Sequence, residues 1–107
     1  MATTDIQRTF GTPTNAKKFT FSIWVKRCNQ GSIDWIMNTA GDFSNINFLA
    51  NDCLEWGEYT SGVKMKLVTN RKFRDPEAWY HLCFTYDSTL AAAGDRQRMY
   101  VNGVEET

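Results

Sequence analysis

The clearest pattern along the chain is an alternation of apolar and polar side chains with a period of two. Over residues 19–27, every second residue from Phe19 to Val25 is apolar, and Trp24 shares the other face with polar residues. Residues 63–69 repeat the alternation, with lysines on the polar face. A period of two, carried by β-branched and aromatic residues, predicts half-buried β-strands.

Turn-forming residues divide the rest of the chain into further strands. Asn102-Gly103 stands between two valines, which is the pattern of a two-residue hairpin turn. Residues 79–87 carry apolar groups on both faces, and this predicts a central strand covered on both sides. Strands are expected over residues 19–27, 33–37, 46–49, 54–56, 63–69, 79–87 and 96–101, with the start of another at 104–107. Short strands at even spacing, without an amphipathic helix, predict an antiparallel β-sandwich or barrel.

The length predicts a single domain. A chain of 107 residues can bury one hydrophobic core. We expect an N-terminal arm and lead-in over residues 1–18 and the β-sandwich over residues 19–107. The return strand at 104–107 is short, so we expect the sheet to be completed by another chain or by residues beyond Thr107.

Charge and hydropathy exclude two classes of partner. The 12 basic and 12 acidic residues balance to a net charge of zero, whereas a nucleic-acid-binding domain needs a basic surface. No stretch approaches the roughly 20 apolar residues of a membrane-spanning helix. The first residues also lack the basic and apolar regions of a signal peptide. We therefore expect no nucleic acid and no membrane insertion.

The cysteines point to packing and not to metal binding. Cys28, Cys53 and Cys83 form no Cys-x-x-Cys pair, and the chain has one histidine, so a zinc ligand set is missing. An odd number of cysteines without a signal peptide indicates free thiols in a reducing compartment. We expect them to pack as small apolar side chains in strands.

Three blocks of sequence, in order, carry a resemblance to a known family. They are residues 19–27, residues 73–81 with Trp79-Tyr80-His81, and residues 95–103 with Tyr100-Val101-Asn102-Gly103. Together they resemble the laminin-G-like, concanavalin A-like jelly rolls of tailed-phage virion proteins, over residues 8–107. The resemblance implies an antiparallel β-sandwich of this type. Such domains are longer than this chain, so the resemblance also implies that the jelly roll is incomplete here.

The same resemblance implies two functions. The first is a non-enzymatic virion structural protein, such as a fibre, spike or capsid decoration. Such a protein would form a homo-oligomer, contact other virion subunits and be assembled in the host cytoplasm. The alternative is a lectin-like carbohydrate-binding module that recognises glycans on the host surface.

A glycan site needs exposed aromatic side chains beside polar and acidic loops. The best local candidates in the sequence are Trp56, Tyr59, Asn51, Asp52 and Glu58. The alternative for the tryptophan is that it packs in the core with Leu54, because large aromatic residues dominate protein cores.

The sequence offers no convincing set of catalytic residues. Glu55 and Glu58 are three residues apart, so they point to opposite faces of a strand unless Gly57 forms a bulge. His81 and Cys83 share a face, but a histidine inside such an apolar strand is expected to be structural. We therefore expect no enzyme activity.

Two further features have both a functional and an ordinary interpretation. Calcium is left open as a cofactor, because Asp42, Asp87 and Asp95 lie in loops, although turn chemistry also explains a loop aspartate. A run of basic residues would suit a polyanion or a partner, or form the solvated side of a strand and turn. The run consists of Lys64, Lys66, Arg71, Lys72 and Arg74.

Overall fold

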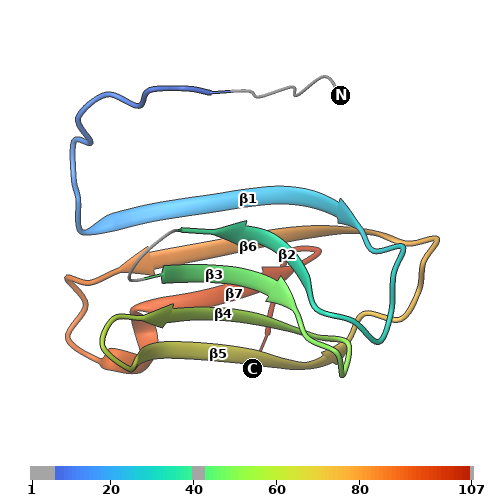
Figure 1. The fold of residues 1–107 in the computed structure, drawn as a ribbon. Helices are drawn as coiled ribbons and strands as arrows, with labels where there is room; N and C mark the ends of the chain where they lie inside the picture. Colours follow the sequence, from blue (N-terminus) through green and yellow to red (C-terminus); the bar gives the residue numbers. More distant parts are fainter. Residues whose placement is uncertain (1–6, 40–42, 107) are drawn as a thin grey trace.

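The computed structural model describes residues 7–39 and 43–106. Over these residues the chain forms eight β-strands and one short 3-10 helix (Figure 1). The elements are β1 (Lys18–Lys26), β2 (Asp34–Asn38), β3 (Phe43–Phe48), β4 (Cys53–Tyr59), β5 (Val63–Lys72), β6 (Trp79–Asp87), η1 (Ala93–Asp95), β7 (Gln97–Val101) and β8 (Val104–Glu105). No helix in the described part is long and apolar enough to cross a membrane.

The strands form two antiparallel sheets of four strands each. Sheet A has the order β1-β6-β7-β8, and sheet B has the order β2-β3-β4-β5. The two sheets pack face to face, with sheet B in front in the view of Figure 1. The predicted antiparallel β-sandwich is therefore confirmed.

The core lies between the sheets and follows from the alternation in the sequence. Sheet B contributes Ile46, Leu54 and Trp56, which are fully or almost fully buried. Sheet A contributes Leu82 and Phe84 from β6. The Trp56 ring meets the Phe84 ring edge to face, with 5.4 Å between the ring centroids. Burial of these apolar surfaces is the main favourable contribution to folding.

Strand β6 is central, as predicted, but the prediction that both of its faces are covered is wrong. It pairs with β1 on one side and β7 on the other. Its inner face is buried, whereas Trp79 on its outer face is 60% exposed. No described element packs outside sheet A, so the second apolar face of this strand is a surface. There the His81 ring lies 5.1 Å from the Trp24 ring of β1.

The hairpin turn between β7 and β8 has the predicted geometry. Asn102 and Gly103 both have positive φ, at 51° and 81°, as a type I′ turn requires. The return strand is short, because β8 contains only Val104 and Glu105.

The three cysteines are free thiols in three different environments. Cys53 is buried and Cys83 is half-buried, so the packing prediction is confirmed for Cys53. The prediction is wrong for Cys28, which is exposed in the loop after β1.

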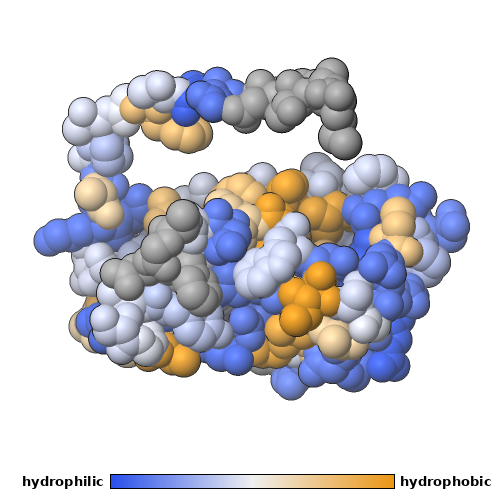
Figure 2. Space-filling model, in the orientation of Figure 1, coloured by the Kyte–Doolittle hydropathy of each residue, from blue (hydrophilic) through white to orange (hydrophobic). Residues whose placement is uncertain are grey.

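A groove runs between β1 and β2 at the open side of the sandwich. It has a volume of about 410 Å³ and an apolar wall that includes Ile23 and Val25 of β1 and Ile36 of β2. Hydrophobic surface is visible on this side, below the segment that precedes β1 (Figure 2).

Candidate functional site

The outer face of sheet B carries polar side chains that are buried against one another. Asn45 and Asn47 of β3 lie opposite Gly57 and Glu55 of β4 in the strand register. Their neighbours in sequence, such as Trp56, point into the core, so these four residues lie on the outer face. Both asparagines and Glu55 are nevertheless buried. Buried polar groups of this kind need hydrogen-bond partners.

A hydrogen-bonded network around Glu55 supplies these partners. Asn45 Nδ2 donates to Glu55 Oε1 at 3.1 Å and also to Asn47 Oδ1. The Tyr59 hydroxyl donates to the same Glu55 oxygen at 3.2 Å. Lys66 Nζ lies 2.9 Å from Glu55 Oε2 and forms an ion pair with it. We call these five side chains the Glu55 network.

The charges of this network are stabilised in their ionised forms. Burial alone would raise the pKa of Glu55, but hydrogen bonds from Lys66, Asn45 and Tyr59 outweigh it, so the pKa is lowered. The hydrogen bond and charge of Glu55 in turn raise the pKa of Lys66. At neutral pH the network therefore holds a carboxylate and an ammonium group with no net charge.

Gly57 lets the Tyr59 side chain fold back over the network. A Cβ atom at Gly57 would lie 2.6 Å from Tyr59 Cε2, which is too close unless the ring shifts. The ring can therefore hold its present position only because residue 57 is a glycine. The aromatic ring covers the strand at this point, and its hydroxyl reaches Glu55.

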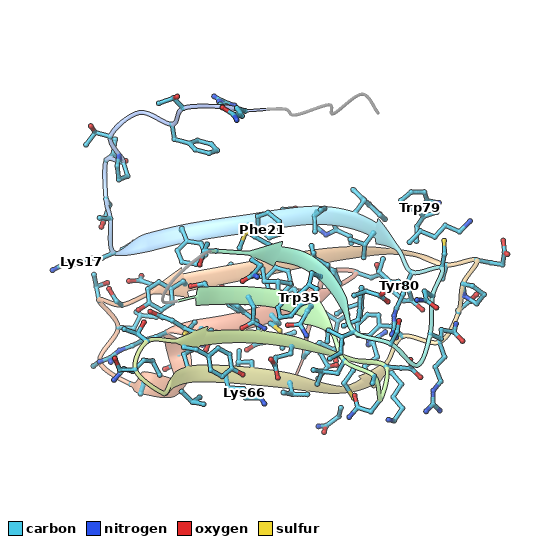
Figure 3. All side chains as sticks on the ribbon, in the orientation of Figure 1. Lys17, Phe21, Trp35, Lys66, Trp79 and Tyr80 are labelled. Atoms are coloured by element: carbon cyan, nitrogen blue, oxygen red, sulfur yellow. The ribbon has the colours of Figure 1, made fainter. Side chains whose placement is uncertain are left out.

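An exposed tryptophan stands beside the network on the same face. Trp35 of β2 lies directly opposite Asn47 of β3, and paired residues in antiparallel strands share a face. Trp35 is 56% exposed. Figure 3 labels Trp35 and Lys66, which come from the two edge strands of sheet B. The polar site therefore extends across the whole sheet.

This arrangement combines an aromatic plane with fixed polar groups. We call it the sheet B face, and it consists of Trp35, Asn45, Asn47, Glu55, Tyr59 and Lys66. Aromatic surface with a few placed hydrogen-bonding groups is the usual composition of a small-molecule site. A ligand with one apolar side and several hydroxyl groups matches both parts of this face.

Comparison with known families agrees with the architecture. A family model, Laminin_G_3, described as the Concanavalin A-like lectin/glucanases superfamily, matches residues 2–107. The chain belongs to this family. It matches no curated protein and no solved structure in the corresponding comparisons. The concanavalin A-like identity of the sandwich thus rests on the family match and on the two antiparallel sheets.

In this concanavalin A-like domain, the five residues predicted for glycan binding are not brought together. Tyr59 lies on the sheet B face. Trp56 is 1% exposed and packs in the core with Leu54, which confirms the alternative given for it. A buried ring offers no surface for a sugar, so Trp56 does not belong to an exposed site. Glu58 lines a separate cavity of about 240 Å³ whose wall includes Tyr86 and Gln97 of sheet A.

The other two predicted residues belong to the turn between β3 and β4. The Asn51 side chain accepts a hydrogen bond from the backbone N–H of Cys53, and the Asn51 backbone carbonyl accepts one from Lys72 Nζ. Asp52 is buried between Arg27 and Arg74, at 2.8 and 2.9 Å. Both residues stabilise the turn, and neither is part of the sheet B face.

Sequence reasoning missed most of the sheet B face, although a signal was present. Asn45 and Asn47 flank Ile46 in sequence. Because alternate residues of a strand point to opposite faces, the two asparagines lie on the face away from the core. Glu55, Gly57 and Tyr59 are two residues apart on β4, so they share one face of this strand in the same way. The predicted opposition of Glu55 and Glu58 is confirmed, since the two lie on different faces and Gly57 pairs in register with Asn45.

The described loops do not gather a calcium site. Asp87 is paired with Lys18 at 3.0 Å, and Asp95 is paired with Arg98 at 2.9 Å. Asp42 lies outside the described residues. No group of three or more Asp, Glu, His or Cys side chains within residues 7–39 and 43–106 is arranged to hold a metal ion.

His81 has a local partner that the sequence did not reveal. Its Nε2 atom lies 2.7 Å from Ser22 Oγ, on the outer face of sheet A. The ring also contacts Trp24 of the neighbouring strand. These contacts agree with a structural histidine, but on a surface and not inside a covered strand.

Most side chains of the basic run form ion pairs. Besides the Lys66 pair, Arg71 contacts Glu106 at 2.8 Å, and Arg74 contacts Asp52. These contacts support the interpretation of the run as the solvated side of a strand and turn.

Proposed function

We propose that this chain is a carbohydrate-binding module that holds a sugar on the sheet B face. One observation carries the proposal: Trp35 is half exposed directly beside the Glu55 network, on the same face of one sheet. A sugar ring has an apolar side of C–H groups and an edge of hydroxyl groups. The indole ring of Trp35 suits the first, and the amides and carboxylate of the network suit the second.

The charge of the face favours a neutral sugar. Glu55 and Lys66 neutralise each other at 2.9 Å, so neither an acidic nor a basic ligand is attracted by an unpaired charge in this pair. The pair still offers hydrogen-bond acceptors and donors of the strong, charge-assisted kind. The ligand class that fits is therefore an uncharged sugar.

Binding without hydrolysis fits the carboxylates better than catalysis does. Glycoside hydrolysis by the usual mechanisms uses two carboxyl groups that flank one bond. Glu55 lies on the sheet B face, whereas Glu58 lines a cavity on the other side of the strand. We therefore propose a module that retains its ligand unchanged.

Affinity electrophoresis in gels that contain a neutral polysaccharide tests the proposal. Xylan, laminarin, galactan and a mixed-linkage β-glucan form a suitable panel, because retardation of the band reports binding directly. We expect at least one polysaccharide to retard the protein, and Trp35→Ala to remove the retardation.

Trp24→Ala is the matched control, because Trp24 is 63% exposed but lies on sheet A. It should be retarded like the unaltered chain. If Trp24→Ala loses retardation and Trp35→Ala keeps it, the binding site lies on sheet A and the proposal is wrong. If no polysaccharide of the panel retards the chain, the proposal of a neutral-sugar module is also wrong.

A second candidate function is that of a virion structural subunit, as the resemblance to phage proteins implies. The observation that supports it is the pair of exposed tryptophans on the outer face of sheet A. Trp24 lies opposite His81, and Trp79 lies opposite Lys26, so both share this face. Large exposed apolar side chains gathered on one surface are typical of a protein–protein contact.

Light scattering of the native chain tests this second candidate. A discrete oligomer that dissociates in the Trp24→Ala/Trp79→Ala double variant would support a role as a building block. A monodisperse monomer at high concentration would contradict assembly of this chain with copies of itself. The two candidates use different sheets and are compatible in one molecule.

A further inference from the structure

One acceptor of the Glu55 network has no partner. Asn45 is 1% exposed, and its Oδ1 atom accepts no hydrogen bond from any residue that the structure describes. The orientation of the amide is fixed, because Nδ2 faces two acceptors, Asn47 Oδ1 and Glu55 Oε1. Buried acceptors without a partner are rare and call for an explanation.

The Tyr59 ring lies over Gly57, on the same side of the strand as this acceptor. The position of a Cβ atom on Gly57 lies 2.9 Å from Asn45 Oδ1 and 2.6 Å from Tyr59 Cε2. The ring and the unpartnered oxygen therefore both border the same position above the glycine. The Tyr59 hydroxyl, at the far end of the ring, donates to Glu55 Oε1 at 3.2 Å.

We propose that the Tyr59 side chain is a displaceable lid that occupies the position of a ligand on the sheet B face. Its hydroxyl makes the hydrogen bond to Glu55 that a ligand hydroxyl makes after displacement. When the ring leaves, Asn45 Oδ1 becomes accessible and gains the donor that it lacks. The identity of the ligand as a sugar rests on the proposed function, whereas the lid itself rests on the geometry around Gly57.

The two acceptors define the chemical class of the ligand. Glu55 Oε1 accepts from the same amide group that carries Asn45 Oδ1, so both acceptors lie within reach of one small group. Neither a carboxylate oxygen nor an amide oxygen donates. The ligand must therefore supply two neighbouring hydroxyl donors, which is a vicinal diol.

A lid of this kind lowers the apparent affinity of the closed protein. The apparent Kd is the intrinsic Kd divided by the fraction of molecules that are open. Minor conformations are commonly populated at about 10% or less. Removal of the lid should therefore tighten binding by about tenfold or more.

The first experiment needs no natural ligand. Glycerol, which carries vicinal hydroxyls, is titrated into ¹⁵N-labelled protein while the resonances of Gly57 and the Asn45 side-chain amide are followed. We expect Tyr59→Ala to show saturable shifts at glycerol concentrations that leave the unaltered chain unchanged. Tyr100→Ala is the control, because Tyr100 is a half-buried tyrosine on the outer face of sheet A. It should behave like the unaltered chain.

The probe 1,2-dimethoxyethane separates the need for donors from simple filling of the space. It carries two neighbouring ether oxygens but no hydroxyl hydrogen. Shifts in Tyr59→Ala with glycerol and not with dimethoxyethane support the lid and the diol. Equal responses of Tyr59→Ala and the unaltered chain, or equal responses to the two probes, would overturn the proposal.

The second experiment uses the polysaccharide gels and distinguishes this proposal from the proposed function. Tyr59→Ala should be retarded more strongly than the unaltered chain, with a dissociation constant lower by about tenfold. Weaker retardation would show that Tyr59 belongs to the binding surface, and would overturn the lid while the proposed function stands. A glycerol response confined to Tyr59→Ala, in a protein that no polysaccharide retards, would support the lid and remove the proposed function.

Tyr59→Phe protects both experiments against a variant that fails to fold. It keeps the ring over Gly57 but removes the hydrogen bond to Glu55. The lid is then held less tightly, so glycerol should shift the Gly57 resonance at concentrations between those of the other two proteins. A Tyr59→Phe protein that needs more glycerol than the unaltered chain would contradict the lid.

Discussion

Arg27 and Asp52 are 25 residues apart in sequence, yet Arg27 Nη1 lies 2.8 Å from Asp52 Oδ1 in a buried ion pair. The same guanidinium group donates to three backbone carbonyls, those of Ser32, Leu49 and Phe73. Arg74 holds the other oxygen of Asp52. The pair therefore joins the loop after β1, the turn between β3 and β4, and the segment after β5, at one end of the sandwich.

The first prediction concerns the loss of this arginine. Arg27→Met keeps much of the length of the side chain but removes the buried guanidinium group from Asp52 and from the carbonyls of Ser32 and Phe73. Arg74 and the Gly31 N–H remain on Asp52. Removal of one partner from a buried ion pair is costly, and we expect the free energy of unfolding to fall by about 3 kcal/mol. Urea denaturation measures the change. Arg98→Met, which breaks exposed ion pairs at the surface, should change stability much less.

The second prediction concerns acid. The backbone N–H of Gly31, followed by Arg74 and Arg27, lowers the pKa of Asp52 from 3.8 to about 2. The folded protein therefore holds this carboxylate ionised more strongly than the unfolded chain does. The stability that it contributes is complete above about pH 4 and is lost as the pH falls towards 2.

Thermal melts between about pH 2 and pH 6 measure this dependence. The melting temperature of the unaltered chain should fall steeply below about pH 4. Asp52→Asn should start from a lower melting temperature at the upper end of this range and should lose less of it on acidification. An equally steep fall in both proteins would show that other carboxylates cause the acid sensitivity.

The third prediction concerns Gly57 and Tyr59 together. In Gly57→Ala the new methyl group meets Tyr59 Cε2 at 2.6 Å, so either the ring moves or the sheet shifts. Overpacking of this kind costs about 1–3 kcal/mol. In the Tyr59→Ala background the ring is absent, and the part of this cost that comes from the ring should disappear, whereas the contact of the methyl group with Asn45 Oδ1 at 2.9 Å remains. A double-mutant cycle by urea denaturation measures the coupling, and additive effects would contradict the contact.

The fourth prediction compares two tryptophans of opposite environment. Trp56→Ala removes a fully buried ring from contact with Phe84, and large-to-small changes of this size cost about 3–5 kcal/mol. Trp24→Ala removes an exposed ring from sheet A and should cost far less. Similar losses of stability in the two variants would contradict the placement of Trp56 in the core.

The alternation in the sequence predicted an antiparallel sandwich or barrel, and the resemblance to known jelly rolls selected the sandwich. Apolar residues at every second position of residues 19–27 mark β1, and Asn102-Gly103 marks the last hairpin. Both signals are local, because a pleated strand and a type I′ turn depend on neighbouring residues alone. The same local reasoning failed for β6, since apolar groups on both faces do not show whether a second layer exists.

The candidate site depended on contacts that a local pattern does not contain. The predicted cluster joined Trp56 to Tyr59 because they are close in sequence, but positions three apart on a strand point to opposite faces. The Glu55 network combines β3, β4 and β5, and its members meet only through the strand register. Trp35 joins them from β2, which is the most distant strand of the sheet in sequence from Lys66.

The proposed sugar site is tested most directly by mapping the ligand onto the residues. An oligosaccharide cut from the polysaccharide that retards the protein is titrated into ¹⁵N-labelled chain, and the shifts of backbone and side-chain amides are recorded. The account predicts shifts at the side-chain amides of Asn45 and Asn47, the indole of Trp35 and the backbone of Gly57. Shifts at the indoles of Trp24 and Trp79, with those four groups unchanged, would contradict it.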